Sequence, residues 1–233
     1  GDKVLRILHG STLDLATEDW NLSGFKDRAV VSLEDGAHTW SWDTGHGINI
    51  GNDALGTDSE AELLVTGSST VWTNRGFVHL GANPRGDDDD TEGVLTVTDG
   101  ADGVIEGDLG IAWEDNQGDS TAVDDSRVVV EGNGSTLSVE EDLYVGYEGH
   151  RGHLYVTNNG EVAVKANFSM GYTSSSTDNT AHVESGGRLY VTNAAGNAAV
   201  DILRGTLTVD GGTATVDRVF VTETTGTLAV DAG

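Results

Sequence analysis

The chain has 233 residues, of which 39 are acidic and 12 basic, and its formal net charge is −27. Such a charge repels a phosphate backbone, so we expect no nucleic acid partner. The absence of cysteine excludes disulfides and thiolate metal sites, and no apolar run reaches the ~20 residues of a membrane-spanning helix, so we expect no direct membrane insertion.

A phrase of three short predicted strands recurs about eight times along the chain. The first strand of each phrase carries two apolar residues with one residue between them. Because strand side chains alternate between two faces, both members of a pair point to the same side, which we expect to be a shared interior. The pairs are Leu5/Ile7, Val31/Leu33, Leu63/Val65, Leu95/Val97, Val128/Val130, Leu154/Val156, Leu207/Val209 and Leu228/Val230, with a weaker copy at Ala181/Val183.

The middle strand of each phrase starts at an apolar residue that returns every 25 to 33 residues. We expect this residue to point inward. The position reads Leu13, Trp40, Val71, Val104, Leu137, Val162, Leu189 and Val216. The second inward position of this strand holds polar residues at Thr73, Glu106 and Arg218, which we interpret as corners exposed to solvent.

The third strand again shows apolar pairs, and the residue between the two members should point outward. His79, Gly110 and Tyr144 are examples of such outward positions. The inward pairs are Trp20/Leu22, Ile48/Ile50, Val78/Leu80, Leu109/Ile111, Leu143/Val145, Phe168/Met170, Val200/Ile202 and Val219/Val221.

Equivalent strands that return once per phrase predict that each strand lies in parallel register on its counterpart one turn later. The expected fold class is therefore all-β: a parallel β-helix, or three-strand β-solenoid, of about eight coils of 25–33 residues. No stretch has helical spacing of apolar residues, and a β-sandwich, the main alternative, does not explain the repetition. No linker interrupts the repeat, so residues 1–233 should form one solenoid domain, as part of a longer array or assembly.

Acidic residues concentrate in the connections that follow the third strands, between residues 51 and 63, 81 and 95, and 112 and 128. These three connections hold fourteen of the 39 acidic residues. Insertions in a solenoid map to one edge, where carboxylates could supply the six to eight oxygens that calcium prefers. Calcium is the only cofactor that the sequence suggests, and a solvated acidic surface is the alternative. The candidate metal ligands are Asp87, Asp88, Asp89, Asp90, Glu92, Glu114, Asp115 and Asp119.

Some apolar residues fall on predicted outward positions and are candidates for binding a surface glycan or a protein receptor. In the register given above, Trp72 and Ile105 form an outward pair on adjacent coils. On the first strands Leu64, Val129 and Tyr155 also point outward. The alternative is that these are isolated apolar residues on the surface, without a binding role.

The sequence contains no motif that identifies an enzyme. HExxH and GxSxG are both absent, and loop carboxylates do not reveal the defined separation that glycoside hydrolysis needs. His150 and His153 lie at one turn, but they lack the helical spacing of a metal pair. We therefore expect a protein that is not an enzyme. Three Asn-x-Ser sequons, at Asn21, Asn133 and Asn167, matter only if the source glycosylates proteins.

The segments DLYVGYEGHRGHLYVTNNGEVAV and FVHLGANPRGDDDDTEGVLTVTDGADGVI resemble a known repeat. That repeat, approximately LxVGxxGxGxLxVxxGGxV, occurs in type V autotransporter passenger domains and in PEP-CTERM-associated bacterial surface proteins. The residues that fill it are Leu143, Val145, Gly146, Gly149, Gly152, Leu154, Val156, Gly160 and Val162. The resemblance implies a right-handed β-helix outside the cell or on its surface, with an adhesive, matrix-forming or stalk role.

These observations favour a non-catalytic extracellular or cell-surface module that is structural or adhesive. One alternative is a filament subunit that self-associates head to tail through the solenoid ends, because neither end shows an obvious cap and TLAVDAG supplies only the first strand of a ninth coil. A second alternative is a glycan-binding or glycan-degrading β-helix.

Overall fold

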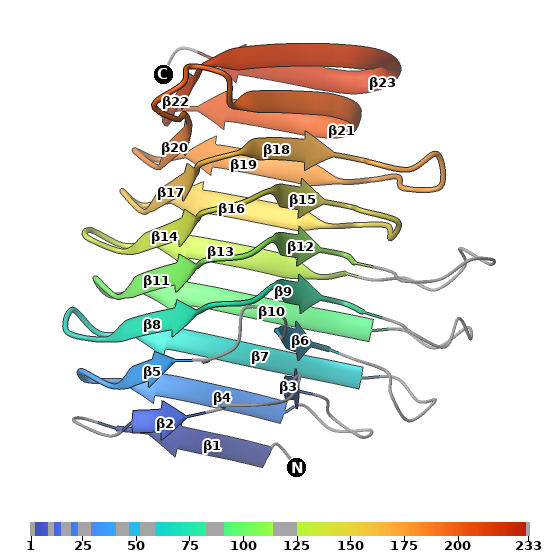
Figure 1. Ribbon diagram of the computed structural model, residues 1–233. Coiled ribbons are helices and arrows are strands. Elements are labelled where there is room, and N and C mark those ends of the chain that lie inside the picture. The colour runs from blue at the N-terminus through green and yellow to red at the C-terminus, as the bar shows by residue number, and fades with distance from the viewer. Residues whose placement is uncertain are drawn as a thin grey trace.

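The computed structural model describes residues 3–8, 12–14, 20–22, 29–40, 47–51, 59–82, 91–113 and 125–231, and every regular element in them is a β-strand. These residues contain no helix long and apolar enough to cross a membrane. Figure 1 shows the strands in layers that rise from the N-terminal to the C-terminal side. Each layer holds a first, a middle and a third strand, as the apolar alternation predicts, and the all-β prediction is confirmed.

The first strands pair in parallel from one layer to the next, with their apolar pairs in register. Leu63, for example, lies beside Val31 of the layer before and Leu95 of the layer after. The first strands are β1 (Lys3–Ile7), β4 (Ala29–Glu34), β7 (Ser59–Thr66), β10 (Thr91–Thr98), β13 (Arg127–Glu131), β16 (His153–Thr157) and β19 (Thr180–Glu184).

The middle strands form a separate sheet of eight parallel strands within the described residues. They are β2 (Thr12–Asp14), β5 (His38–Trp40), β8 (Val71–Asn74), β11 (Asp102–Ile105), β14 (Thr136–Val139), β17 (Glu161–Val164), β20 (Arg188–Val191) and β22 (Thr213–Val216).

The third strands stack in the same way and join the first strands near the C-terminal side. They are β3 (Trp20–Leu22), β6 (Ile48–Ile50), β9 (Val78–Leu80), β12 (Leu109–Ile111), β15 (Leu143–Val145) and β18 (Asn167–Met170). β21 (Ala199–Asp210) and β23 (Arg218–Asp231) each run through a third-strand position and the first-strand position that follows it. First and third strands therefore belong to one parallel sheet of 15 described strands.

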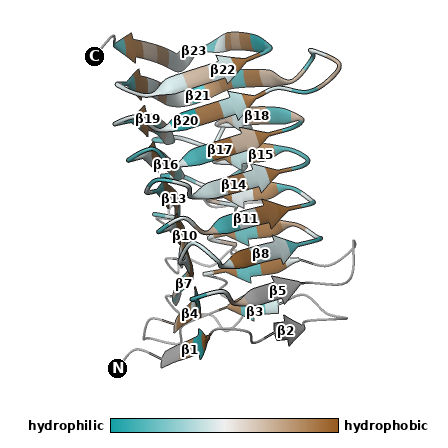
Figure 2. Ribbon diagram, turned by 90° about the vertical axis from the view of Figure 1, so that its left-hand side faces the viewer, coloured by the Kyte–Doolittle hydropathy of each residue, from teal (hydrophilic) through white to brown (hydrophobic). Residues whose placement is uncertain are grey.

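The core is a continuous apolar interior between the sheets. Figure 2 shows the hydrophobic bands that alternate with hydrophilic ones along the strands. Leu154 and Val156 of β16 are fully buried, as are Phe168 and Met170 of β18, and all four belong to the same apolar cluster. This continuity is what the repeated pairs require, because no single layer can cover its own apolar face.

Among the described middle strands, those of three layers differ from the predicted register by one residue, and that of the last layer differs by two. Thr39, rather than the predicted Trp40, pairs with Leu13 and Trp72. Ala214, rather than the predicted Val216, pairs with Leu189.

Trp72 pairs with Gly103 and Gly103 with Leu137, so the inward column of the middle strands does not contain Val71 or Val104. Trp72 is 3% exposed and Ile105 is fully buried. The prediction that Trp72 and Ile105 form an outward apolar pair is therefore wrong.

Complementary side-chain volumes explain this register. A Cβ atom on Gly103 would lie 3.3 Å from Cε3 of Trp72 and 3.0 Å from Cδ1 of Leu137, so the missing side chain makes room for its two larger neighbours. Asn74, the next inward residue after Trp72, is polar and buried. Its side-chain amide donates to the backbone oxygens of Gly76 and Phe77 at 2.8 and 2.9 Å, so its hydrogen-bonding groups are satisfied in the interior.

Two first strands begin earlier than the sequence predicted. β7 and β10 start at Ser59 and Thr91, and the small residues Ala61 and Gly93 pair there in the interior. A Cβ atom on Gly93 would lie 2.3 Å from the backbone oxygen of Ile50, so this corner admits no larger side chain. Three acidic residues assigned to connections are consequently strand residues, and these are Glu60, Glu62 and Glu92.

Candidate functional site

Six aromatic side chains from four successive layers form a continuous stack on the outer side of the third strands; we call it the aromatic column. His79 stacks on Trp113 with ring centroids 3.9 Å apart, and Trp113 stacks on Tyr147 at 4.0 Å. Tyr172 continues the stack, 4.9 Å from Tyr147 and inclined to it by 10°. The members of the column are Phe77, His79, Trp113, Tyr144, Tyr147 and Tyr172.

A glycine makes room for the indole at the centre of the column. Gly110 holds the outward position of β12, in register with His79 and Tyr144 of the neighbouring layers. A Cβ atom on Gly110 would lie 2.2 Å from Cε3 of Trp113. The indole therefore folds back over bare backbone and fills the outward position that the sequence leaves empty.

The stacked rings cover much of one another's faces. Tyr144 meets Trp113, Tyr147 and Tyr172 edge to face, with centroids 5.2 to 5.6 Å apart. Each such pair contributes roughly 0.5–1.5 kcal/mol beyond the burial of its area, so the column ties four layers together. Tyr172 differs from the other rings because it is 48% exposed. One face of its ring stacks on Tyr147, and no described ring stacks on the other face.

An acidic corner lies beside the column, where the chain enters the third strands. The Asp142 amide donates to Oδ1 of Asp108 at 2.9 Å, and the Asn167 amide donates to Oδ1 of Asp142 at 2.8 Å. The Tyr144 hydroxyl donates to Oδ2 of Asp142 at 3.1 Å. These contacts connect three layers and bring two carboxylates next to the aromatic rings.

The pKa values reflect this crowding. Burial raises the pKa of Asp108, the Asp142 amide lowers it, and the negative charge of Asp142 raises it again. Burial, followed by the charge of Asp142, raises the pKa of Tyr144 well above its usual range. The carboxylates of Asp108 and Asp142 place negative charge beside the column, which favours neutral or cationic partners over anionic ones.

The other predicted binding residues do lie on an outward face. Leu64 of β7, Val129 of β13 and Tyr155 of β16 occupy the same outward position of the first strands and are half-buried. Tyr155 stacks on His182 of the next layer, with centroids 5.3 Å apart and an interplanar angle of 7°. Leu64, Val129 and Tyr155 point outward, on a different strand stack from the aromatic column, and their role in binding stays a prediction.

Of the eight predicted calcium ligands, only Glu92 falls among the described residues. Its carboxylate is paired with the guanidinium of Arg127 on the next first strand. Asp87, Asp88, Asp89, Asp90, Glu114, Asp115 and Asp119 lie outside the described residues. Within the described ranges no group of three or more His, Asp or Glu side chains is arranged to hold a metal ion, and calcium binding by the acidic connections stays a prediction.

His150 and His153 have separate hydrogen-bond partners. Nδ1 of His150 lies 2.8 Å from the hydroxyl of Thr177. Nδ1 of His153 lies 2.8 Å from the hydroxyl of Thr180, and its Nε2 lies 3.1 Å from Asp125. Burial lowers the pKa of His153, while Asp125 opposes that shift.

Sequence reasoning missed the aromatic column, although the sequence carries a signal for it. An aromatic residue follows the third-strand pair at the same offset in three phrases, ending IAW at Trp113, VGY at Tyr147 and MGY at Tyr172. Because the layers stack in register, a residue at a constant offset recurs at a constant place on the surface. Comparison with protein-family models, with curated proteins and with solved structures finds no match for this chain.

Proposed function

We propose that the chain is a right-handed parallel β-helix that acts as a non-catalytic structural module with an adhesive surface, outside the cell or on its surface. The observation that carries the proposal is the continuity of the stack, in which strands pair in parallel with their counterparts one repeat away. A repeated phrase that builds such a stack is typical of solenoids. The resemblance to autotransporter passenger and PEP-CTERM-associated repeats supports the handedness and the location.

A filled solenoid is suited to presenting surface residues rather than to enclosing a reaction. Its interior is packed with apolar side chains, whereas outward residues recur at the strand spacing of ~4.8 Å. The aromatic column uses this spacing to place rings from four layers in one line. Aromatic residues are enriched where proteins contact partners, which supports an adhesive role for this surface.

The carboxylates next to the column support a non-catalytic role. Oδ1 of Asp142 accepts from the backbone and side-chain amides of Asn167, and its Oδ2 accepts from Tyr144. Oδ1 of Asp108 accepts from the Asp142 amide. These contacts connect layers, so we assign both carboxylates a role in the architecture. Release of reducing sugar from neutral or acidic glycans by the purified chain would contradict the non-catalytic assignment.

Adhesion is tested with beads that carry the purified chain, measured by retention under flow on polysaccharide-coated, protein-coated and bare mineral surfaces. We expect retention on at least one surface, and a several-fold loss with Tyr172→Ser, which removes the most exposed ring of the column. The matched control is Tyr190→Ser, on the outward face of β20 and outside the column. Failure of the native chain to adhere to any surface, or equal losses in both variants, would overturn the adhesive function.

A second candidate function, head-to-tail self-association, is favoured by apolar residues at both ends of the described stack. On β23, Val221 is 48% exposed and Val230 is 69% exposed, although both belong to columns that are buried in the preceding layers. Leu5 of β1 is 50% exposed at the other end. Because β1 and β23 contribute to the same first-strand columns, a second copy would continue the stack with like side chains in register.

A further inference from the structure

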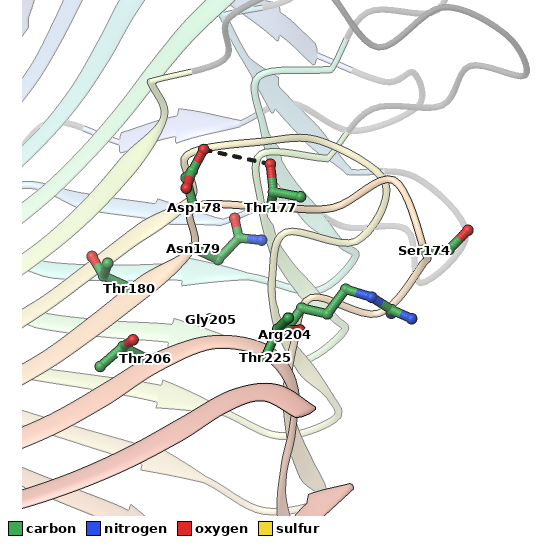
Figure 3. A pocket seen from close by; sticks show the side chains of 9 residues that line it. All are labelled: Ser174, Thr177, Asp178, Asn179, Thr180, Arg204, Gly205, Thr206 and Thr225. Carbon is green, nitrogen blue, oxygen red and sulfur yellow. Dashed lines mark hydrogen bonds between the residues drawn. The ribbon is translucent and has the colours of Figure 1, made fainter. Parts of the chain in front are cut away.

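A cavity of about 670 Å³, lined by polar residues and one glycine, lies on the outer side of the late layers (Figure 3). One wall is the segment from Ser174 to Thr180, which leads from β18 into β19, and the other wall comes from β21 and β23. Its volume is within the ~300–1,000 Å³ of small-molecule sites. The lining residues are Ser174, Thr177, Asp178, Asn179, Thr180, Arg204, Gly205, Thr206 and Thr225.

Buried hydrogen bonds fix the position of the first wall. Asn179 is 1% exposed and Ser176 is fully buried. Oδ1 of Asn179 accepts from the Gly152 amide at 2.8 Å, and its Nδ2 donates to the Ser176 hydroxyl at 2.7 Å. The Ser176 hydroxyl lies 2.8 Å from the backbone oxygens of Gly146 and Gly149. Satisfied buried groups of this kind fix the segment, so the cavity is preorganised.

The second wall combines bare backbone with a fixed guanidinium. A Cβ atom on Gly205 would lie 2.5 Å from the backbone oxygen of Asn179, so a side chain is excluded there. Nη1 of Arg204 lies 2.8 Å from the backbone oxygen of Thr173 and 3.3 Å from that of Gly171, the two residues that flank Tyr172. Arg204 therefore links this wall to the segment that carries the exposed ring at the end of the aromatic column.

The lining chemistry fits a neutral polyhydroxyl ligand. Four threonines line the cavity, and their methyl groups can contact apolar carbon faces. The hydroxyls of Thr177 and Thr180 already contact His150 and His153, so Thr206 and Thr225 carry the hydroxyls that can donate to and accept from a ligand. The positive charge of Arg204 is compensated by the carboxylate of Glu223, which lies 3.7 Å from Nη2 of Arg204. With a net charge of −27 on the chain, an anionic ligand is disfavoured.

We propose that this cavity binds one unit of a neutral saccharide, and that Tyr172 contacts an adjoining unit of the same glycan. The proposal rests on the adhesive function proposed above and names the class of partner for that surface. Substitution of Thr206 tests the proposal most directly, because the Thr206 side chain lines the cavity. Thr206 belongs to β21, and the pairing of β21 with β19 and β23 does not depend on the Thr206 hydroxyl.

The experiment titrates the full chain with cellotetraose, maltotetraose and mannotriose while amide NMR signals are followed. We expect at least one probe to shift the signals of Gly205, Thr206 and Thr225, and Thr206→Val to weaken that binding about 2- to 10-fold, as the loss of one hydrogen bond implies. The matched control is Thr208→Val, the next residue on the same face of β21 but outside the cavity; it should leave the affinity unchanged. Tetragalacturonate, an anionic probe, should leave the signals in place.

Three results would overturn the cavity proposal: no neutral probe shifts these signals, Thr206→Val and Thr208→Val weaken binding equally, or tetragalacturonate binds as well as a neutral probe. The bead assay separates this failure from that of the proposed function. Beads that adhere while every probe fails to bind would leave the adhesive function standing without the saccharide site. Probe binding without bead adhesion would leave the saccharide site standing and would overturn the adhesive function.

Discussion

Single residues decide where charge and aromatic surface meet on this protein. Asp108 and Asp142 sit at equivalent corners of adjacent layers, and Asp108 accepts the amide hydrogen of Asp142 while its own carboxylate is repelled by that neighbour. The hydrogen bond needs only one oxygen acceptor. The negative charge of Asp108 is therefore separable from its architectural role.

Asp108→Asn should stabilise the protein at pH 7 by ~0.5 kcal/mol, because it removes like-charge repulsion between neighbouring layers and keeps an oxygen acceptor. Since the pKa of Asp108 is raised on folding, its ionisation costs stability as the pH rises through the folded-state pKa and costs nothing below the unfolded-state value. The difference between variant and native chain should thus vanish near pH 3. Urea unfolding of the variant and the native chain at pH 7 and at pH 3 measures this difference in the free energy of unfolding.

Asp142→Asn is the contrasting variant, because both oxygens of Asp142 accept hydrogen bonds, from Asn167 and from Tyr144. It should destabilise the protein at pH 7. An equal gain in stability for both substitutions would show that charge alone governs this corner.

Individual strands depend on their neighbours above and below for burial, so one column contains both buried and exposed members. Leu154 of β16 is fully buried, whereas Leu228 of β23 belongs to the same first-strand column and is 40% exposed. The two residues have the same side chain and strand position. They differ in whether a further described strand covers them.

Leu154→Ala should cost about 2–5 kcal/mol, because it leaves a cavity between two covered layers. Leu228→Ala should cost less than about 1 kcal/mol, since its side chain has solvent on one side. Urea unfolding followed by circular dichroism compares the two. Similar costs would mean that the last layer is covered in solution.

At the scale of the whole molecule, exposed apolar residues on β1 and β23 are combined with a strongly acidic chain. Stacking of a second copy on β23 would bury apolar residues, while the net charge of −27 opposes the approach of two copies. We therefore expect association that grows as salt screens the charge.

Electron microscopy and sedimentation velocity at rising salt should show rods longer than the ~40 Å expected for eight stacked layers. Val221→Glu, at the exposed end, should abolish them, and Ala163→Glu, at an outward position of β17 inside the sheet of middle strands, should not. A native chain that stays monomeric at high concentration and high salt argues against the filament.

The sequence by itself determined the strand content, the parallel stacking and the inward columns of the first and third strands. Pairs such as Leu63/Val65 and Val78/Leu80 are apolar on alternate positions and return once per phrase, so a shared interior is the only place that buries them all.

Only the tertiary structure decided which of two adjacent apolar residues points inward, and which outward residues meet. Val71 and Trp72 are both apolar, and Trp72 is inside because Gly103 of the next layer leaves space for the indole. Trp113 joins His79 and Tyr147 because Gly110 leaves bare backbone beneath it. Such choices depend on volumes contributed by separate layers, and a pattern read along one strand does not contain them.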